Sequence, residues 1–246
     1  MRIGILETGD IPAYLVDAEG SYPAMFARML LAEDPRLSFQ TVSVVHGETP
    51  SGPHQADAWI ITGSRHGVYD DLPFIAPLKQ FISDCVAAGV PLAGICFGHQ
   101  ILAEALGGRA VKSEKGWGLG AQDYPLVNRP SWMEGSAAAY TGLAVHQDQV
   151  VALPAEATVL SASPFCEIAA VAYGDAERPS AISVQSHPEF SPAVVRAIVK
   201  DRRDSAAIGK PLADAALASL ETPLLDNPWP RWILSGFRRS LAARAA

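Results

Sequence analysis

The sequence predicts an α/β protein of three layers, in which an open, mostly parallel sheet lies between helices on both faces. Short apolar runs bounded by glycine and proline alternate with segments of helical periodicity along the first half of the chain. Strands that alternate with helices in this way are typical of a parallel sheet covered on both sides. In addition, 49% of the 246 residues are hydrophobic, which is enough for a large core.

Seven short segments are expected to be strands, because each is apolar and bounded by turn-forming residues. They are residues 3–7, 42–46, 58–62, 91–95, 158–161, 168–173 and 181–185. Helices are expected over residues 21–33, with Ser21 as the N-cap, over residues 76–89, and from Cys96 to the glycines at 107 and 108.

One catalytic domain is expected over residues 1–200, followed by a helical extension over residues 201–246 that packs on it. The middle of the chain, residues 111–140, is rich in glycine, proline, serine and asparagine, which predicts hairpins and loops and no domain boundary. Residues 205–246 are rich in alanine and contain four prolines, which indicates helices at the edge of the domain. This segment could also form a contact between protomers, so a homodimer stays open.

The composition argues against several classes of partner. The net charge is −7 and no run of lysine or arginine occurs, so neither a nucleic-acid surface nor an anionic-membrane patch is expected. No segment approaches the roughly 18 apolar residues of a membrane helix, and the N-terminus is expected to be a strand and not a signal peptide. Three widely spaced cysteines favour free thiols in a reducing cytoplasm. A small neutral or zwitterionic substrate fits this composition.

The segment PLAGICFGHQ, residues 91–100, places a cysteine between two glycines where an apolar run gives way to helical periodicity. Cys96 is expected on a sharp strand-to-helix turn, with Gly94 and Gly98 giving the strand and the helix room to approach. Amides at a helix N-terminus favour a thiolate, and the amide of Phe97 can receive an oxyanion. A buried structural cysteine is the alternative, because free cysteines often pack in cores.

A candidate base lies downstream in AISVQSHPEF. His187 precedes a proline, which favours extended backbone, so the side chains of His187 and Glu189 are expected on the same side. The carboxylate can then orient the imidazole while the imidazole takes the thiol proton. A surface histidine beside a helix-capping glutamate is the alternative, because a helical pattern follows at once.

Together, GICFGHQ and SHPEF resemble the class I glutamine amidotransferases, whose glutaminase domains carry a cysteine turn followed downstream by a histidine and a glutamate in this arrangement. The resemblance covers residues 1–200 in order: an early strand, ITGS, the cysteine turn, HQDQV and SHPEF. It is strongest toward stand-alone proteins similar to the glutaminase half of GMP synthase. The resemblance implies a flavodoxin-like fold.

The resemblance also implies a role for each matching residue. Cys96 would attack the γ-carbonyl carbon of glutamine or a glutamine-like γ-glutamyl compound, forming a thioester and releasing ammonia or an amine. His187 would move the protons and Glu189 would hold it in place. The backbone amides of Gly63 and Phe97 would form the oxyanion hole.

Four further residues are implied to bind the substrate. Gln100 lies one helical turn after Cys96, and His146 and Asp148 belong to HQDQV, which resembles a family loop that borders the substrate. Ser64 stands where the family usually has a second glycine, so the backbone geometry of the ITGS loop stays open. For His146 and Asp148, a polar surface loop is an equal alternative.

No metal and no cofactor are expected. The histidines have no spacing suited to a metal site, and the phosphate-binding pattern GxxxxGK followed by serine or threonine is absent. The SGG-type loop of the ATP-using half of GMP synthase is absent too, so the chain alone is expected not to consume ATP. Trp117, in KGWGLG, is expected to be a packed aromatic beside tight turns, with a pocket-lining role as the lesser alternative.

Three functions are therefore open. The chain could be a glutaminase that hands ammonia to a separately encoded synthetase, or a self-sufficient hydrolase of γ-glutamyl amides and peptides. It could also be a binding or regulatory protein that kept the fold without the chemistry. The presence of Cys96, His187 and Glu189 favours an enzyme that cleaves γ-glutamyl amides, and leaves the acceptor open.

Overall fold

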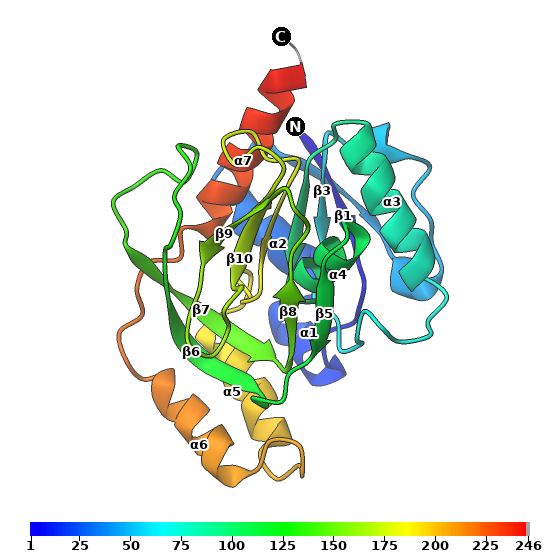
Figure 1. The fold of residues 1–246 in the computed structure, drawn as a ribbon. Coiled ribbons are helices and arrows are strands. Elements are labelled where there is room, and N and C mark those ends of the chain that lie inside the picture. The colour runs from blue at the N-terminus through cyan, green and yellow to red at the C-terminus, as the bar shows by residue number, and fades with distance from the viewer. Residues whose placement is uncertain (245–246) are drawn as a thin grey trace.

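A seven-stranded sheet forms the centre of the protein, of which the computed structural model describes residues 1–244 (Figure 1). The strand order is β2-β1-β3-β4-β11-β10-β9; the first five are parallel and β10 is antiparallel to both of its neighbours. The strands are β1 (Arg2–Leu6), β2 (Ser38–Val42), β3 (Ala58–Ile61), β4 (Leu92–Ile95), β9 (Ala157–Ser161), β10 (Ala170–Tyr173) and β11 (Ala181–Val184). The mostly parallel α/β sheet predicted from the sequence is confirmed.

The strands at the centre of the sheet are buried on both faces. In β3, Ala58 and Ile60 belong to one apolar cluster, whereas Trp59 and Ile61 belong to a second cluster. The side chains of a strand point alternately to opposite faces, so this period of two is the signature of a sheet with a core on each side. The same alternation occurs in β4, where Ile95 and Leu92 enter different clusters.

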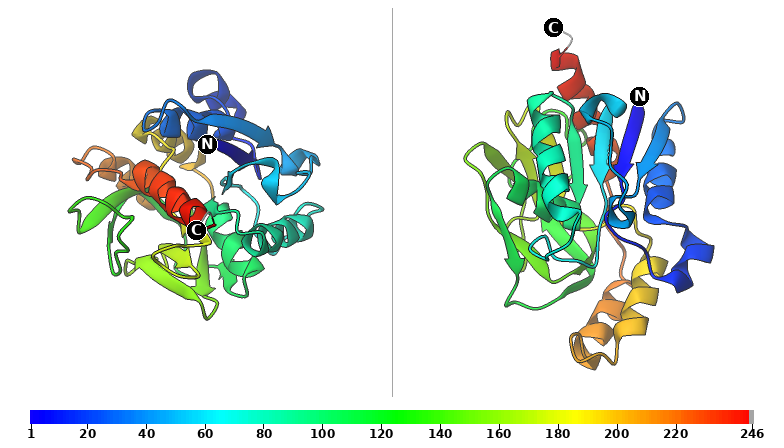
Figure 2. Two further views of the ribbon diagram at one scale, coloured as in Figure 1. Left: turned by 90° about the horizontal axis from the view of Figure 1, so that it is seen from above. Right: turned by 90° about the vertical axis from the view of Figure 1, so that its right-hand side faces the viewer.

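Helices cover both faces. The buried hydrophobic side chains of α2 (Tyr22–Leu31), α5 (Pro192–Arg202) and α7 (Trp229–Arg244) belong to the first cluster, apart from Pro23. Those of α3 (Ile75–Ala87) and α4 (Phe97–Ala105) belong to the second cluster. Figure 2 shows these two layers on either side of the sheet. Two short helices, α1 (Ala13–Glu19) and α6 (Lys210–Ser219), lie at the lower end of Figure 1 near α5.

Two small antiparallel pairs form the middle of the chain, where hairpins and loops are expected. Strand β5 (Arg109–Lys112) pairs with β8 (Asp148–Ala152), and β6 (Gly118–Pro125) pairs with β7 (Ala139–His146). These pairs lie beside the central sheet in Figure 1. They bring the HQDQV segment toward the carboxyl ends of the parallel strands.

Helix boundaries follow local signals in the sequence. The Ser21 hydroxyl accepts a hydrogen bond from the Ala24 N–H at 3.4 Å at the start of α2, as an N-cap does. Gly89 and Gly107, just past the ends of α3 and α4, have φ angles of +66° and +98°, and glycine adopts such angles without strain.

The strand expected over residues 42–46 is displaced toward the N-terminus. Strand β2 ends at Val42, and Val44–His46 forms a 3-10 helix instead, followed by Gly47 at a φ angle of +86°. The displacement has a local cause. Ser38–Val42 is only partly apolar but pairs in register with β1, whereas the more apolar valines at 44 and 45 belong to the turn.

The C-terminal helix lies within the main core. Trp229, Trp232 and Phe237 of α7 are each 1% exposed and belong to the first apolar cluster. A guanidinium nitrogen of Arg238 lies 2.8 Å from the Asp34 carboxylate, which ties α7 to the chain just after α2. The division at residue 200 stays a prediction, but α7 is packed as part of the same core. Across residues 1–244, no helix has the length and apolar character needed to span a membrane.

Candidate active site

Cys96 occupies a strained turn between β4 and α4. Its backbone φ and ψ angles are 55° and −102°, and it is the one non-glycine residue with positive φ in the described chain. A Cβ atom at Gly94 would collide with the carbonyl group of Gly98, and one at Gly98 would collide with the carbonyl oxygen of Ile61. The glycines on either side of Cys96 therefore allow α4 to start directly against the sheet, as the sequence predicts.

His187 and Glu189 form a buried pair just after β11. The imidazole Nδ1 lies 2.6 Å from Glu189 Oε1, and the two side chains are 3% and 0% exposed. The ring of Phe190 stacks on the imidazole with a centroid distance of 4.1 Å and an interplanar angle of 2°. The backbone N–H of His187 donates to the carbonyl oxygen of Leu143 in β7. These contacts fix the imidazole, and they leave Nε2 as the nitrogen that can exchange a proton.

The charge of His187 follows from its neighbours. Burial by itself lowers the pKa of the imidazole, but the charges of Glu189 and Cys96, together with the hydrogen bond to Glu189, raise the pKa to about 10. A buried imidazolium is stable here because it faces a carboxylate on one side and the sulfur on the other.

The ITGS loop lies against the same imidazole. A Cβ atom at Gly63 would lie 2.7 Å from His187 Cε1, so this position has room only for glycine. The carbonyl oxygen of Gly63 accepts hydrogen bonds from the hydroxyls of Thr8 at 3.2 Å and Thr62 at 3.1 Å. In a trans peptide the carbonyl and the following N–H point in opposite directions, so the N–H of Ser64 points away from the threonines.

The first turn of α4 begins beside the sulfur. The N–H of Gly98 donates to the carbonyl oxygen of Thr62 at 3.2 Å, and that of Gln100 donates to the carbonyl oxygen of Cys96 at 3.1 Å. The N–H of Phe97, the first residue of the helix, is one of the amides that helix geometry leaves without an intrahelical acceptor. The Gln100 side chain donates to the carbonyl oxygen of Asp148 at 3.0 Å and to Gln185 Oε1 at 3.3 Å.

The HQDQV segment forms another wall of the site. His146 Nδ1 lies 3.2 Å from the carbonyl oxygen of Asp148, an acceptor, so this nitrogen carries the hydrogen. Burial lowers the pKa of His146 to about 4, so the ring is neutral. Its Nε2 is buried and has no hydrogen-bond partner within residues 1–244. The Asp148 carboxylate accepts a hydrogen bond from the Tyr69 hydroxyl at 2.8 Å.

A cavity of about 730 Å³ joins these groups. Six of the nine residues expected at the site are accounted for in its lining: Cys96, His187, Ser64, Gln100, His146 and Asp148. Gly63, Phe97 and Glu189 lie just behind this lining and contribute backbone or support. Whether each residue acts as expected in a reaction stays a prediction.

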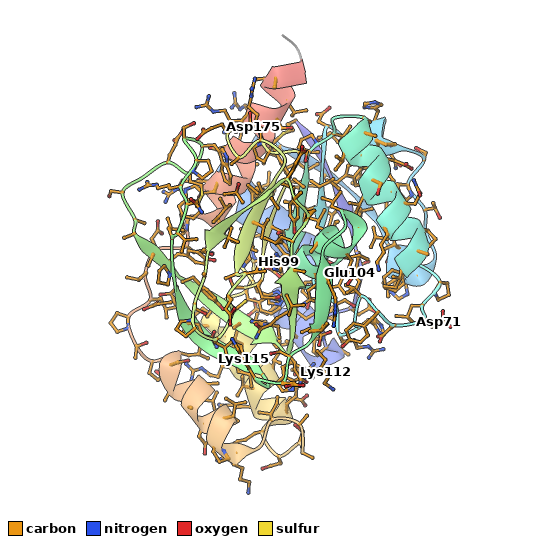
Figure 3. The ribbon with its side chains drawn as sticks, viewed as in Figure 1. Asp71, His99, Glu104, Lys112, Lys115 and Asp175 are labelled. Carbon is orange, nitrogen blue, oxygen red and sulfur yellow. The ribbon has the colours of Figure 1, made fainter. Side chains whose placement is uncertain are left out.

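The cavity also includes residues that the sequence analysis missed. They include residues from five places in the chain: Asp10–Ala13, Tyr22, the 65–70 segment with Tyr69, Lys112 and Arg202. Trp117 packs against the core, as expected, and also lines the cavity. Figure 3 labels Lys112 at the lower end of the molecule, on the side where α1 and α5 lie. No local sequence pattern predicts these residues, because they come from distant segments that meet at the cavity only in the folded chain.

His99 has a structural position, as its isolated place in the sequence suggests. Its Nδ1 lies 2.7 Å from the Ser183 hydroxyl and its Nε2 lies 3.1 Å from the carbonyl oxygen of Ile168. Burial lowers its pKa to about 3. The neutral ring therefore ties α4 to the strands beneath it, in the interior seen in Figure 3.

An open α/β sheet with a strained cysteine turn at its carboxyl edge, beside a buried histidine–glutamate pair, has the architecture of the glutaminase-type α/β proteins. Residues 14–202 match the family described as glutamine amidotransferase class-I. The protein belongs to the class I glutamine amidotransferase family.

Individual relatives agree with this assignment. Gamma-glutamyl peptidase 3 of Arabidopsis thaliana is 27% identical over 192 residues, which is 75% of this chain and 76% of the relative. A glutamine-hydrolyzing GMP synthase subunit of Halobacterium salinarum is 30% identical over 181 residues, covering 72% and 88% of the two chains. A solved glutamine amidotransferase from Thermotoga maritima superposes with a TM-score of 0.72 and 21% identity over 99% of this chain and 97% of its own. The fold is therefore that of the family.

Proposed function

We propose that the protein cleaves the γ-glutamyl amide bond of glutamine or a glutamine-like compound through a thioester on Cys96. The observation that carries the proposal is the 2.6 Å contact between His187 Nδ1 and Glu189 Oε1, beside a cysteine on a strained turn that opens to a cavity. A nucleophile, a base and a group that orients the base make up the arrangement needed for acyl transfer.

The first step forms the thioester. The imidazolium of His187 carries the proton that Cys96 gives up, and the sulfur anion attacks the γ-carbonyl carbon of the substrate. An imidazolium beside the sulfur attracts the sulfur anion, and this favours attack. As the tetrahedral intermediate collapses, the C–N bond breaks and His187 gives its proton to the departing ammonia or amine. Water then attacks the thioester, with His187 as the base, and releases glutamate.

The oxyanion would be held by backbone amides from two segments, the start of α4 and the ITGS loop. The N–H of Phe97 at the start of α4 is one, as expected from the sequence. Gly63 is the expected second residue. The direction of its carbonyl group toward Thr8 and Thr62 makes the N–H of Ser64 a further donor from the same loop.

The glutamyl part of the substrate would lie between Gln100, Ser64 and the HQDQV segment. His146 supports this placement, because its neutral ring presents a buried Nε2 acceptor without a partner in the described chain. A substrate ammonium group would satisfy that acceptor. The Asp148 carboxylate, which accepts a hydrogen bond from the Tyr69 hydroxyl, would lie near the same ammonium group.

Two ways of using this chemistry are open. One relative is named as part of GMP synthase, which is compatible with a role as a glutaminase that passes ammonia to a synthetase partner. Another is named as a gamma-glutamyl peptidase, which is compatible with a self-sufficient hydrolase. The cavity of about 730 Å³ favours the hydrolase, because sites of roughly 300–1,000 Å³ enclose ligands well beyond the size of a glutamine side chain.

The cellular setting is part of the same proposal. Cys85, Cys96 and Cys166 are all free thiols. Such thiols suit a reducing compartment, and we propose the cytoplasm.

The experiment is to incubate the purified chain, without a partner, with glutamine and a panel of γ-glutamyl peptides and to measure release of glutamate. Release from peptides alone supports the hydrolase. Slow release from every substrate that is restored by a copurifying protein supports the role as a glutaminase for a synthetase. A Cys96→Ala variant that retains wild-type activity would refute the thioester mechanism.

A further inference from the structure

The cavity is lined by more than the catalytic residues. Besides Cys96 and His187, its lining includes Lys112 at the end of β5, Trp117 in the loop after β5, and Ile198 and Arg202 of α5. The amine that leaves the γ-carbonyl carbon must depart into space beside the sulfur. Trp117 and Arg202 line the same cavity as Cys96, so they are available to whatever the amine carries.

The acidic and the basic side chains of the cavity differ in whether they already have a partner. The acidic residues of its lining already have donors: Asp10 lies 3.0 Å from the ring of His46, Asp70 accepts from the Gly67 N–H at 2.9 Å, and Asp148 accepts from Tyr69. In contrast, the Arg65, Lys112 and Arg202 side chains of the lining form no ion pair with a carboxylate of residues 1–244. Lys112 stands opposite Asp148 in the β5–β8 register, so Arg202 is the cation of α5 that brings an unpaired positive charge to the cavity.

Arg202 is placed by an aromatic ring. Its guanidinium carbon lies 5.9 Å from the centre of the Trp117 ring, within the range of a cation–π contact. Stacking of this kind fixes the plane of the guanidinium group without using its N–H donors. Those donors have the fork geometry that matches a carboxylate in a bidentate contact.

We propose that Arg202, held by Trp117, binds the carboxylate of the leaving amine. The preferred substrates are then γ-glutamyl amino acids and short γ-glutamyl peptides, in which the released amine is an amino acid or peptide. This inference rests on the proposed function and adds the leaving-group site to it. Glutamine, which releases ammonia, cannot use this site.

The bond changes remain those of the thioester route. The sulfur–carbon bond to the γ-carbonyl forms, the carbon–nitrogen bond breaks, and the leaving nitrogen takes its proton from His187. The amino acid produced keeps its carboxylate at Arg202 until it dissociates, and water hydrolyses the thioester. No oxidant, reductant or further co-reactant is needed.

The test compares three substrates that share the glutamyl part: γ-glutamyl-glycine, γ-glutamyl-glycinamide and glutamine. For the wild-type protein, kcat/KM is expected to be at least about tenfold higher for the acid than for the carboxamide. Arg202→Ala is expected to lower kcat/KM for γ-glutamyl-glycine about 10- to 100-fold, the effect of losing a hydrogen-bonded charge, and to leave the other two substrates unchanged. Arg202→Lys should retain part of the activity toward the acid.

Lys200→Ala is the matched control. Lys200 is an exposed cation on the same helix, α5, and does not line the cavity. Its removal changes the net charge by the same amount as Arg202→Ala and should leave all three substrates unaffected. The leaving-group site is overturned if wild-type kcat/KM is equal for the acid and the carboxamide. It is also overturned if Arg202→Ala lowers kcat/KM equally for all three substrates. In either case the proposal of γ-glutamyl cleavage stands.

If turnover is absent, a binding measurement tests the leaving-group site separately from the proposed γ-glutamyl cleavage. Cys96→Ala binds γ-glutamyl-glycine without cleaving it, and calorimetry measures the affinity directly. Adding Arg202→Ala to this variant should weaken the affinity by about 10-fold or more, and adding Lys200→Ala should not. Unchanged affinity with the Arg202→Ala double variant rejects the leaving-group site whatever the catalytic result.

Discussion

The hydroxyl of Tyr69 donates a 2.8 Å hydrogen bond to the carboxylate of Asp148, 79 positions away in the sequence. This contact joins the loop after β3 to the first residue of β8, and both residues line the cavity. The same loop carries Ser64, whose hydroxyl accepts a hydrogen bond from the N–H of His66 at 3.2 Å. Tyr69 thus holds the loop that supplies part of the proposed oxyanion hole.

Removing the Tyr69 hydroxyl should therefore slow the reaction without unfolding the protein. Tyr69→Phe is expected to lower kcat/KM for glutamine and for γ-glutamyl peptides several-fold. The reason is that the loop carrying Ser64 loses its hydrogen bond to Asp148. The melting temperature should barely change, since the Tyr69 side chain is 53% exposed. Steady-state kinetics together with calorimetry test this, and an unchanged kcat/KM would show that the contact does not position the loop.

Cys96 should be the one thiol that reacts with a glutamine-directed electrophile. Burial raises the pKa of both Cys85 and Cys166 to about 12, so at neutral pH they stay protonated and unreactive. Peptide mapping after labelling should find the adduct on Cys96, and Cys96→Ala should lower turnover by at least about 10³-fold with the fold intact. Labelling of Cys85 or Cys166 in preference to Cys96 would contradict the assignment.

Gly63 should tolerate no side chain. Its backbone does not require glycine, but a Cβ atom would lie 2.7 Å from His187 Cε1 and would push the imidazole from its place. Gly63→Ala is expected to lower kcat more than about 100-fold, because small displacements of catalytic groups cost that much. Gly236→Ala is the control: its Cβ atom would meet Ile182 at 3.3 Å, away from the cavity, and kcat should stay within a factor of two of wild type.

The buried ion pair of His187 predicts how stability depends on pH. The folded-state pKa of about 10 lies above the ordinary value of 6.5. The charged imidazole therefore contributes stability that is fully present below pH 6.5 and is lost as the pH rises through about 10. Urea unfolding of the wild type and of His187→Gln near pH 6 and near pH 10 should give a difference in unfolding free energy that shrinks at the higher pH. A difference that is constant or grows would show that His187 is neutral in the folded protein.

Some of the fold could be predicted because its causes are local. The strand before Cys96, the tight turn and the helix after it follow from apolar spacing and from two glycines within five residues. The strand expected at residues 42–46 was wrong because pairing with β1 selects Ser38–Val42, and a short apolar run does not reveal its partner. The role of α7 in the core also depends on partners that lie far away in the sequence.

The sequence by itself determined the type of fold, the strained cysteine turn and the adjacent positions of His187 and Glu189, because each depends on residues within one or two helical turns of each other. The tertiary structure alone decided that His187 and Cys96 line one cavity, that Tyr69 holds Asp148, and that Arg202 and Lys112 line the same cavity. The physical reason is the order of strands in the sheet. It brings the carboxyl ends of β3, β4 and β11 together, and that order is set by packing between distant segments, which no local pattern records.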